Sequence, residues 1–265
     1  MPRIMGILNV TPDSFSDGGK FISLERALNQ VSRMMEEGAD IIDIGGCSSR
    51  PGADHVSEEE EINRILPVVS EVLASFPDIL VSIDTFRSGV AKRMLELGAH
   101  IINDISAGKL DPNMMKVVAE FQVPYVMMHM KGKPQNMQQM AEYDDVIEEV
   151  WDFMTSKIQE AREVGIRDII LDPGFGFGKK ILHNYQLLGG FERFSMLDLP
   201  LLAGISRKSM MYKLLKNEPD ENLEIGTALH AKLLEKGAQI LRVHDVAAAK
   251  KMIDIHMYMK TNGII

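Results

Sequence analysis

The sequence predicts an α/β fold, with a single (β/α)8 barrel of the TIM type as the first choice for residues 1–265. Three observations support this prediction. The chain has 265 residues, close to the roughly 250 that such a barrel needs. Eight short apolar runs alternate with longer segments of helical periodicity. Polar or ionisable residues follow every apolar run, whereas the turns that lead back into the runs are short and plain.

The apolar runs have the length of strands, and they are apolar on both faces, as is typical of parallel strands that helices cover. In chain order we expect strands over residues 4–8, 41–44, 80–83, 100–102, 125–128, 169–171, 201–203 and 240–243. The helical periodicity predicts helices over residues 24–37, 58–75, 88–97, 112–121, 144–164, 182–191, 223–235 and 245–259. A doubly wound open sheet has the same alternation and remains the alternative.

Three turns from a helix into the next apolar run share one pattern, which favours a repeated helix-to-strand unit. They read EGAD at 37–40, LGAH at 97–100 and KGAQ at 236–239. The glycine is expected to end each helix in the left-handed conformation, which glycine adopts most readily. This weak repeat does not by itself require a closed sheet. No linker, charge block or low-complexity segment interrupts the chain, so we expect one domain.

The composition excludes several classes of protein. A hydrophobic content of 45% is enough for a full core, and the net charge of −9 argues against a nucleic-acid partner. Cys47 is the only cysteine, so no internal disulfide can form. No apolar run approaches the roughly 20 residues of a membrane helix, and the N-terminus has no signal-peptide pattern. We therefore expect a cytoplasmic protein that acts on small molecules and has no membrane partner.

The polar residues after the apolar runs predict where the active site lies, because ligands of parallel α/β proteins bind at the C-terminal ends of the strands. Asp84, Asn103 and Asp172 come several residues before the helices that follow them. They are therefore poorly placed to act as helix caps, whereas Asp245 is well placed to cap the last helix. The concentration of such residues at one end of the strands favours an active site there.

Basic residues also gather after the apolar runs, among them Arg50, Lys208, Arg242 and His244. An acidic chain that concentrates its cations at one end favours an anionic ligand, most simply a phosphate. The chain has no P-loop, no GxGxxG after its first apolar run, no HExxH and no cysteine–histidine ligand set. A Mg²⁺ ion held by ligand phosphates and few protein oxygens leaves little trace in a sequence, and Asn9 is a candidate ligand.

A second group of polar residues suits a flat heterocycle with an amidine-like edge. The group comprises Asp84, Asn103, Asp172 and Lys208. A carboxylate such as Asp172 can accept two parallel N–H bonds, and Lys208 can donate to a ring carbonyl. Buried polar groups of this kind are costly unless a ligand satisfies them.

The first loop, NVTPDSFSDGG at 9–19, is longer than a connection between a strand and a helix requires. Asn9 stands at the expected strand end, and residues 11–13 have the composition of a turn. Phe15 and Asp17 are placed to reach over the barrel mouth. We expect this loop to be a lid that becomes ordered with substrate and excludes water.

Seven motifs together resemble the dihydropteroate synthase family, the folate-pathway enzymes that sulfonamide drugs inhibit. They are GILNVTPDSFSDGG, DIGGCSSRPGA, SIDTFR, INDISAG, LDPGFGFGK, GISRKSM and RVHDV, and they run from residue 6 to 246. The resemblance implies a (β/α)8 barrel, usually a homodimer. It also implies the joining of 4-aminobenzoate to 6-hydroxymethyl-7,8-dihydropterin diphosphate, which gives 7,8-dihydropteroate and diphosphate.

The resemblance also implies a role for each site residue. The pterin would be bound by Asp84, Asn103, Asp172 and Lys208, and the diphosphate by Asn9, Ser49, Arg242 and His244, with Asn9 near Mg²⁺. The 4-aminobenzoate would lie against Ser49, Arg50, Pro51, Phe177, Lys208 and Ser209. The catalytic residues would be Asp84, Lys208, Arg242 and His244.

The second loop departs from the family pattern Glu-Ser-Thr-Arg-Pro, since Cys47 stands at the position of the glutamate and Ser49 at that of the threonine. Ser49 keeps the hydroxyl, and Cys47 is expected to be a small buried residue rather than a nucleophile. Two alternatives remain open: a barrel that transfers the methyl group of methyltetrahydrofolate, and a pterin-binding relative without activity. Arg242, His244 and the first loop argue against the first alternative, which would not need an anion site. Intact Asn9, Asp84, Arg242 and His244 argue against the second.

Overall fold

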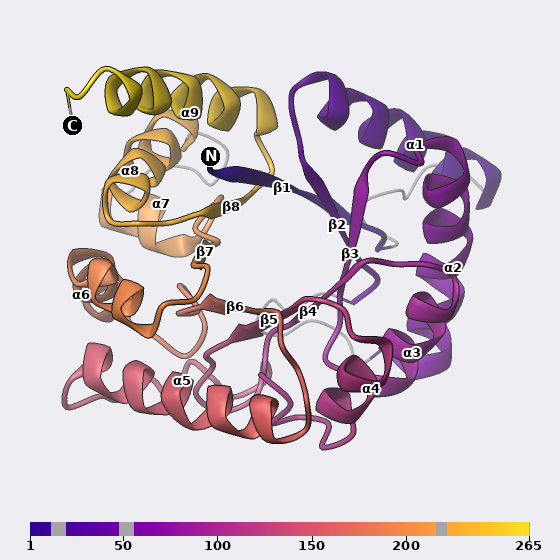
Figure 1. Cartoon of the computed structure of the whole chain (residues 1–265), viewed down its shortest axis with the longest axis horizontal. Coiled ribbons are helices and arrows are strands. Elements are labelled where there is room, and N and C mark those ends of the chain that lie inside the picture. The colour runs from indigo at the N-terminus through magenta and orange to yellow at the C-terminus, as the bar shows by residue number, and fades with distance from the viewer. Residues whose placement is uncertain (12–19, 48–55, 216–221, 265) are drawn as a thin grey trace.

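Eight parallel strands form a closed barrel in the computed structural model, which describes residues 1–11, 20–47, 56–215 and 222–264 (Figure 1). The hydrogen-bonded order is β6-β5-β4-β3-β2-β1-β8-β7. A parallel bridge between Leu171 and Leu201 joins the first and last strands of that order. The predicted barrel is therefore confirmed, and the open-sheet alternative is wrong.

The strands extend one or two residues beyond several of their predicted ends. They are β1 (Arg3–Asn9), β2 (Ile41–Gly45), β3 (Leu80–Asp84), β4 (Ile101–Asp104), β5 (Tyr125–Met128), β6 (Ile169–Asp172), β7 (Leu202–Ala203) and β8 (Ile240–Val243). The sequence prediction stopped at the last apolar residue, but the ladder also includes the polar residue that follows. Asn9, Asp84 and Asp172 are thus the last residues of their strands and are held by the sheet.

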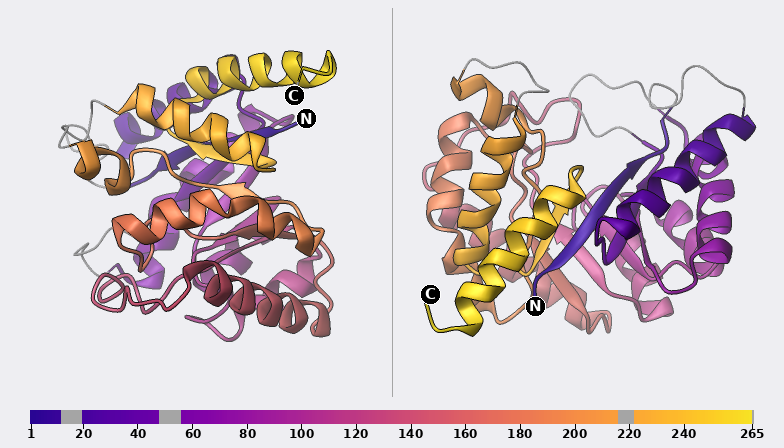
Figure 2. Two further views of the ribbon diagram at one scale, coloured as in Figure 1. Left: turned by 90° about the vertical axis from the view of Figure 1, so that its left-hand side faces the viewer. Right: turned by 90° about the horizontal axis from the view of Figure 1, so that it is seen from above.

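Helices surround the barrel and alternate with its strands (Figures 1 and 2). They are α1 (Lys20–Glu36), α2 (Glu58–Ser75), α3 (Ser88–Glu96), α4 (Met114–Phe121), α5 (Val146–Glu163), α6 (Ile181–Gly189), η2 (Phe191–Leu197), α7 (Ser209–Leu215), α8 (Leu223–Glu235) and α9 (Val246–Thr261). The predicted strict alternation is wrong between β7 and β8, where α7 and α8 both occur. The seven residues of α7 make only about two turns, too few to give a clear helical period.

Predicted helix ends are confirmed at three glycines and corrected at one aspartate. Gly38, Gly98 and Gly237 have φ values of 101°, 106° and 95°, as expected for left-handed helix ends. Asp245 occupies the N-cap position of α9, but its side chain makes no capping hydrogen bond. Its carboxylate instead accepts a bond from Arg207 Nη2 at 2.8 Å, which ties the loop after β7 to the start of α9.

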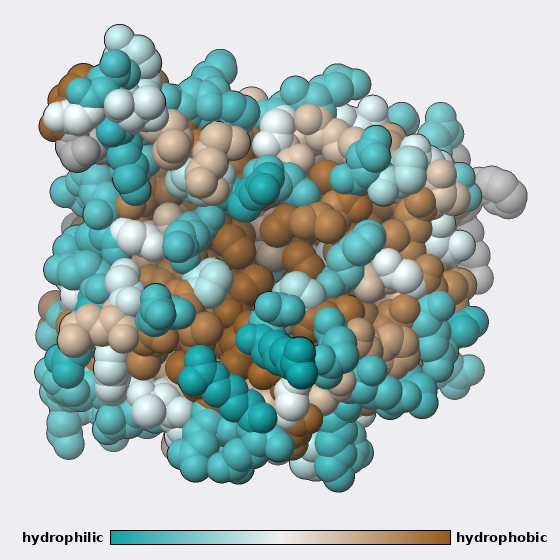
Figure 3. All heavy atoms as spheres, in the orientation of Figure 1, coloured by the Kyte–Doolittle hydropathy of each residue, from teal (hydrophilic) through white to brown (hydrophobic). Residues whose placement is uncertain are grey.

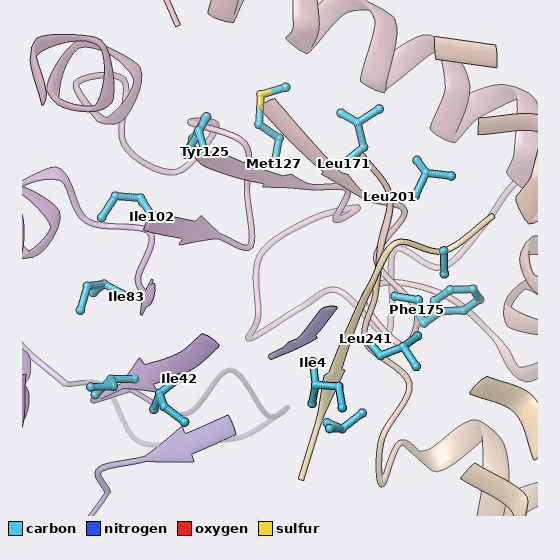
Figure 4. Packing of buried hydrophobic residues seen from close by; sticks show 14 of the residues in the cluster. Ile4, Ile42, Ile83, Ile102, Tyr125, Met127, Leu171, Phe175, Leu201 and Leu241 are labelled. Atoms are coloured by element: carbon cyan, nitrogen blue, oxygen red, sulfur yellow. The ribbon is translucent and has the colours of Figure 1, made fainter. Parts of the chain in front are cut away.

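The outward face of the barrel packs against the helices and forms the main hydrophobic core (Figure 4). Side chains such as Ile42, Tyr125, Met127 and Leu171 point from their strands toward the surrounding helices (Figure 4). Every second residue of a strand faces the same way, so the residues between them face the barrel axis. The two faces of each strand therefore have separate sequence requirements.

The inward face is divided into two layers. The lower layer is apolar and comprises Met5, Ile41, Ile101, Val126, Ile170, Leu202 and Ile240. The polar layer lies one strand repeat further toward the C-terminal ends and comprises Asp43, Ser82, Asp84, Asn103, Asp172 and Arg242. The expectation that the strands are apolar on both faces is therefore wrong for the upper half of the interior.

The lower layer lies toward the face at which the strands begin, where hydrophobic residues gather at the centre within a hydrophilic surround (Figure 3). Strand residues two apart lie on the same face, roughly 6 to 7 Å from one another. The polar layer therefore stands directly above an apolar floor, on the side of the barrel mouth. No helix among the described residues is long and apolar enough to cross a membrane.

Candidate active site

The strand register brings together residues that are far apart in the sequence. Asn9 pairs with Gly45, Gly45 with Asp84, and Asp84 with Asn103, so one row crosses β1 to β4. Gly45 has no side chain in this row, and a Cβ there would lie 3.3 Å from Asp84 Cβ. The absence of a side chain leaves room between Asn9 and Asp84, where a ligand can approach the backbone.

Asp43 is the centre of the hydrogen-bond network in the polar layer. Its Oδ1 accepts from Ser82 Oγ at 2.6 Å, and its Oδ2 accepts from Asn103 Nδ2 at 2.9 Å and from Arg242 Nε at 2.6 Å. Asp43, Ser82 and Asn103 are all buried. Three strands besides β2 are thereby linked through one carboxylate, which fixes the orientation of Asn103 and Arg242.

Arg242 is held between two carboxylates. In addition to the bond from Nε to Asp43, its Nη2 donates to Asp84 Oδ2 at 2.6 Å. These two carboxylates raise the pKa of the guanidinium against the effect of burial, so Arg242 stays charged. Burial raises the pKa of Asp84, Arg242 opposes the rise, and Asp43 adds to it. A buried arrangement of this kind is costly by itself, because each charge gives up its hydration.

Asp172 and Lys208 lie on the other side of the mouth. Asp172 Oδ1 accepts from the Gly174 amide at 2.8 Å, and burial raises the pKa of its carboxyl against the influence of Lys208. Lys208 Nζ donates to Phe175 O and lies 4.7 Å from the centre of the Phe177 ring. Burial lowers the pKa of Lys208 to about 8, although Asp172 opposes the change. The two groups offer an acceptor and a donor above the same apolar floor.

An apolar wall completes the mouth beside β4 and β5. Ile105, Met128, Met130 and Met137 form a buried cluster, against which Phe177 is packed. Met128 is the inward residue of a methionine pair whose other member, Met127, faces the helices. A flat ring placed in the mouth can therefore have an apolar surface on one side and the polar layer along its edge.

His244 is oriented by Ser206 from the loop after β7. Its backbone N–H donates to Ser206 Oγ at 3.2 Å, and its Nδ1 lies 3.0 Å from the same oxygen. One hydroxyl oxygen therefore contacts both the backbone and the ring of His244, which restricts the orientation of the imidazole.

Several predicted site residues lie outside the described part of the chain. These are Phe15 and Asp17 of the first loop and Ser49, Arg50 and Pro51 of the second. Ser209 is described and begins α7, directly after Lys208. The structure therefore brings together Asn9, Asp84, Asn103, Asp172, Lys208 and Arg242, and it leaves the loop contacts untested.

Cys47 is partly buried at the start of the second loop. Burial raises the pKa of its thiol and Glu61 adds to the rise, whereas Arg87 opposes it. Arg87 also pairs with the buried Glu61. A thiol with a raised pKa is a poor nucleophile, in agreement with the predicted structural role.

The comparisons with known proteins agree on one family. The family model described as "Pterin binding enzyme" matches residues 5–244. The chain is 46% identical to the dihydropteroate synthase of Haemophilus influenzae over 258 residues, which cover 96% of this chain and 93% of that protein. The chain belongs to the pterin-binding family of dihydropteroate synthases.

Two solved structures of this family have nearly the same fold. The dihydropteroate synthase of Yersinia pestis in a sulfonamide complex has a TM-score of 0.92 and 43% identity, and covers 98% of this chain and 94% of its own. The enzyme of Xanthomonas albilineans with 4-aminobenzoic acid has a TM-score of 0.91 and 42% identity, with coverages of 98% and 93%. The dihydropteroate synthase barrel is thus shared over almost the whole chain.

Sequence reasoning missed some residues that shape this dihydropteroate synthase site, notably Asp43, Ser82 and Met128. The missing signal was the alternation along each strand, because Asp43 and Met128 are the inward partners of Ile41 and Val126. Counting two residues forward from Ile41 and Val126 leads to Asp43 and Met128, and counting two residues back from Asp84 leads to Ser82.

Proposed function

We infer that the barrel mouth joins 4-aminobenzoate to 6-hydroxymethyl-7,8-dihydropterin diphosphate, with release of diphosphate. One observation carries this conclusion. The acceptors Asp84, Asn103 and Asp172, the cation Arg242 and the amide of Asn9 converge above an apolar floor. The reaction needs this combination, because one substrate carries both a flat polar ring and a charged leaving group.

The pterin ring would lie against the apolar wall, with its polar edge toward Asp172 and Asn103. A carboxylate can accept two parallel N–H bonds from the amidine-like edge of the ring. Lys208 would donate to the ring carbonyl, because its amine lies on the same side of the mouth as Asp172. Asp84 would contribute a second carboxylate, once Arg242 turns part of its hydrogen bonding to the ligand.

The diphosphate would be bound by Asn9, Arg242 and His244, with Ser49 from the second loop. Among the described residues, Arg242 uses its Nε and Nη2 atoms to bind carboxylates. The N–H groups on Nη1 are thus available for phosphate oxygens while Asp43 keeps the guanidinium in place. The imidazole of His244 would supply a further contact to the diphosphate.

The 4-aminobenzoate would lie against Phe177, Lys208 and Ser209 and under Ser49, Arg50 and Pro51. Phe15 and Asp17 of the first loop would close over it. The family relationship supports these loop roles, and the geometry supports those of Phe177 and Lys208, which are already in contact. We propose on the same basis that sulfonamides compete for this site.

The chemical step would begin with departure of diphosphate from the methylene group of the pterin. The electron-rich ring stabilises the positive charge that remains, and the carboxylates of Asp84 and Asp172 would stabilise it further. Arg242 and His244 would stabilise the leaving group. The aromatic amine is neutral at pH 7 and would then attack the methylene carbon. The resulting anilinium nitrogen is acidic and would release its extra proton to the departing diphosphate, so no strong general base is required. The protein would also exclude water from the cation.

The residues present fit a Mg²⁺ ion that is held mainly by the substrate. Among the described residues, no group of three or more histidine, cysteine, aspartate or glutamate side chains is arranged to hold a metal. Asn9 offers a single hard oxygen at the end of β1, and Mg²⁺ commonly combines few protein ligands with substrate phosphates and water. The ion, when bound, would neutralise charge on the leaving diphosphate.

Further proposals concern the state of the whole protein. We propose that residues 1–265 form one domain, that two copies form a homodimer, and that the enzyme works in the cytoplasm on small molecules. No nucleic-acid or membrane partner is proposed, in keeping with the net charge of −9. Transfer of a methyl group from methyltetrahydrofolate is disfavoured, because that reaction releases no diphosphate and would not need the anion site proposed for Asn9, Arg242 and His244.

The test is a diphosphate-release assay with the purified chain, Mg²⁺ and both substrates. Release that requires the pterin diphosphate, Mg²⁺ and 4-aminobenzoate together, with dihydropteroate formed in equal amount, would support the proposal. Binding of the pterin with no release between pH 6 and 9 would overturn it and favour the inactive pterin-binding alternative. This pH range covers the range in which the acid and base groups of enzymes ordinarily work.

A further inference from the structure

Lys179 is a buried lysine that the proposed reaction does not use. Its side chain lies in the loop between β6 and α6 and is only 3% exposed. Nζ lies 2.9 Å from His129 Nδ1, 2.8 Å from Gly174 O and 3.3 Å from Phe177 O. Among the described residues it makes no ion pair with a carboxylate. Its three contacts match the three N–H groups of an ammonium, so none is left for a ligand.

The loop from Asp172 to Lys180 winds around this amine. Gly174, Gly176 and Gly178 all have positive φ values, of 75°, 83° and 60°. A Cβ at Gly174 would lie 2.0 Å from the carbonyl oxygen of His129, so the loop is packed tightly on the end of β5. Asn184 supports the loop from α6, because its Oδ1 accepts from the Gly176 amide at 2.6 Å. The loop is thus tied at several points, with the amine at its centre.

The same loop sets the positions of proposed ligand contacts. The Gly174 amide donates to Asp172, and Phe175 O accepts from Lys208. Phe177 presents its ring to Lys208 while its own carbonyl is bound to Lys179. Moving the carbonyls of Gly174 and Phe177 would therefore displace both an aminobenzoate contact and a pterin contact.

We propose that Lys179 is a positioning residue, whose buried amine gathers the carbonyls of Gly174 and Phe177 against His129 and thereby holds Phe177 and Lys208 in place for 4-aminobenzoate. The inference rests on the proposed function for the identity of the ligand. The amine acts on the loop as a bound cation would, by drawing several oxygens toward one point. Phe177 binds the amine through its own carbonyl, whereas the amine reaches Asp172 only through Gly174, so the aminobenzoate contact depends most strongly on Lys179.

The hydrogen bonds of this cluster can form whether or not the amine of Lys179 carries a charge. An ammonium can donate to both carbonyls and to an unprotonated His129 Nδ1. A neutral amine can still donate to both carbonyls while it accepts from a protonated Nδ1 of neutral His129. Burial lowers the pKa of both Lys179 and His129, which makes the second state accessible. The loop keeps its shape in either case.

The experiment compares Lys179→Met with Lys180→Met in the full-length protein. Lys180 is the exposed neighbour, so its substitution controls for the loss of one lysine from the same loop. Lys179→Met should raise the KM for 4-aminobenzoate by roughly tenfold to a hundredfold, the loss that a displacement of about 1 Å produces, and should change the KM for the pterin diphosphate less. Lys180→Met should leave both constants near the wild-type values.

A milder variant covers the case in which Lys179→Met does not fold. His129→Phe removes one acceptor and leaves the lysine in place, so it should raise the KM for 4-aminobenzoate in the same direction by a smaller factor. KM does not depend on the fraction of active enzyme, so a purely structural loss would lower the unfolding temperature and leave KM unchanged. Unchanged KM values in both His129→Phe and any folded Lys179→Met protein would overturn the proposal.

Amide hydrogen exchange separates this inference from the proposed function. Exchange at residues 174–178 should be faster in Lys179→Met or His129→Phe than in Lys180→Met, with or without any enzyme activity. If the wild-type chain released no diphosphate, the proposed function would fail, and exchange would still decide whether Lys179 holds the loop. Equal exchange in all variants would overturn the positioning role.

Discussion

The lower layer and the polar layer are built on the same strands, yet they have opposite requirements. Ile41 and Asp43, Ile101 and Asn103, Ile170 and Asp172, and Ile240 and Arg242 are pairs of inward residues two positions apart. The lower member of each pair is apolar, and its burial stabilises the fold by about 1.5 to 3 kcal/mol. The upper member is polar or charged and is costly to bury unless it is paired.

On each of these strands, the residue that stabilises the fold and the residue of the polar layer are therefore only two positions apart. The polar layer satisfies itself in the absence of ligand, since Asp43 binds Ser82, Asn103 and Arg242. Its charges are thus arranged before the substrate arrives, which is the condition for electrostatic catalysis. The lower layer supplies a rigid floor that holds this arrangement. Substitutions in the two layers should therefore affect different measurements.

The largest effect is expected for Arg242→Ala in the polar layer. Turnover should fall by about 10³-fold, or about 4 kcal/mol, because a preorganised charge on the leaving diphosphate is lost. The affinity for the pterin should fall much less, because the ring contacts come from other residues. Steady-state kinetics and pterin binding by calorimetry measure the two quantities.

The matched control for this change is Arg193→Ala, which removes a partly exposed arginine paired with Glu148 on the surface. It should leave turnover unchanged, because surface ion pairs contribute little. A loss of pterin affinity as large as the loss of turnover would contradict this role, because Arg242 would then also bind the pterin in the ground state. Denaturant unfolding shows how much stability is lost when Asp43 and Asp84 lose their partner.

The next effect is expected in the lower layer, for Leu202→Ala. Leu202 is fully buried in β7, so its truncation should reduce the free energy of unfolding by about 3 kcal/mol. KM values should remain at the wild-type level, because the polar layer keeps its hydrogen bonds. Leu182→Ala is the control, since Leu182 is 66% exposed, and it should change stability very little. A large rise in KM for the folded Leu202→Ala protein would show that the layers are not independent.

The contrast between the layers also explains which features could be predicted from the sequence. The barrel, the strand centres and the position of Asp84, Asn103 and Asp172 near the strand ends followed from periodicity and motifs, because apolar runs and the polar residues after them are local signals. Asp43 was missed because its partners Ser82, Asn103 and Arg242 are 39, 60 and 199 residues away in the chain. Only closure of the barrel brings them together.

Two other features could not be predicted because packing decides them. Asp245 has the residue type and position of a helix cap, but Arg207 competes for its carboxylate. Lys179 is a cation in a loop near a proposed anion site, yet its amine is directed to His129 and backbone carbonyls. Residue type gave no means of separating this buried lysine from Lys208, for which we propose a ligand contact.

A smaller effect is expected in the pH dependence at Lys208, at the edge of the polar layer. Burial lowers its pKa to about 8, so the amine loses its charge at a lower pH than an ordinary lysine. The kcat/KM for the pterin diphosphate should therefore fall as the pH rises through about 8, since the charged amine is the stronger donor. Lys208→Arg should move this fall to higher pH, because the guanidinium stays protonated.

The control for the pH profile is Lys213→Arg, an exchange at an exposed position of α7. Its profile should match that of the wild type. A basic limb that stays near pH 8 in Lys208→Arg would assign the titration to another group or to the substrate. The maximum rate of the arginine variant is expected to be lower, because the larger head group fits less well beside Asp172.

The smallest effect is expected for Cys47→Ser, two residues beyond the end of β2. The thiol lies near Glu61, Arg87 and Asp84, so Cys47 tests whether the chemistry extends beyond the polar layer. Burial and Glu61 raise the pKa of the thiol, so it is protonated at pH 7 and poorly nucleophilic. The kcat and both KM values should change by no more than about twofold, or roughly 0.4 kcal/mol. The Cys47 thiol should react slowly with iodoacetamide, and the enzyme should keep its activity after a fraction of the molecules has been alkylated. A hundredfold loss of turnover together with fast alkylation would instead place a reactive thiol at the barrel mouth. The residues that take part in the reaction would then extend beyond the polar layer.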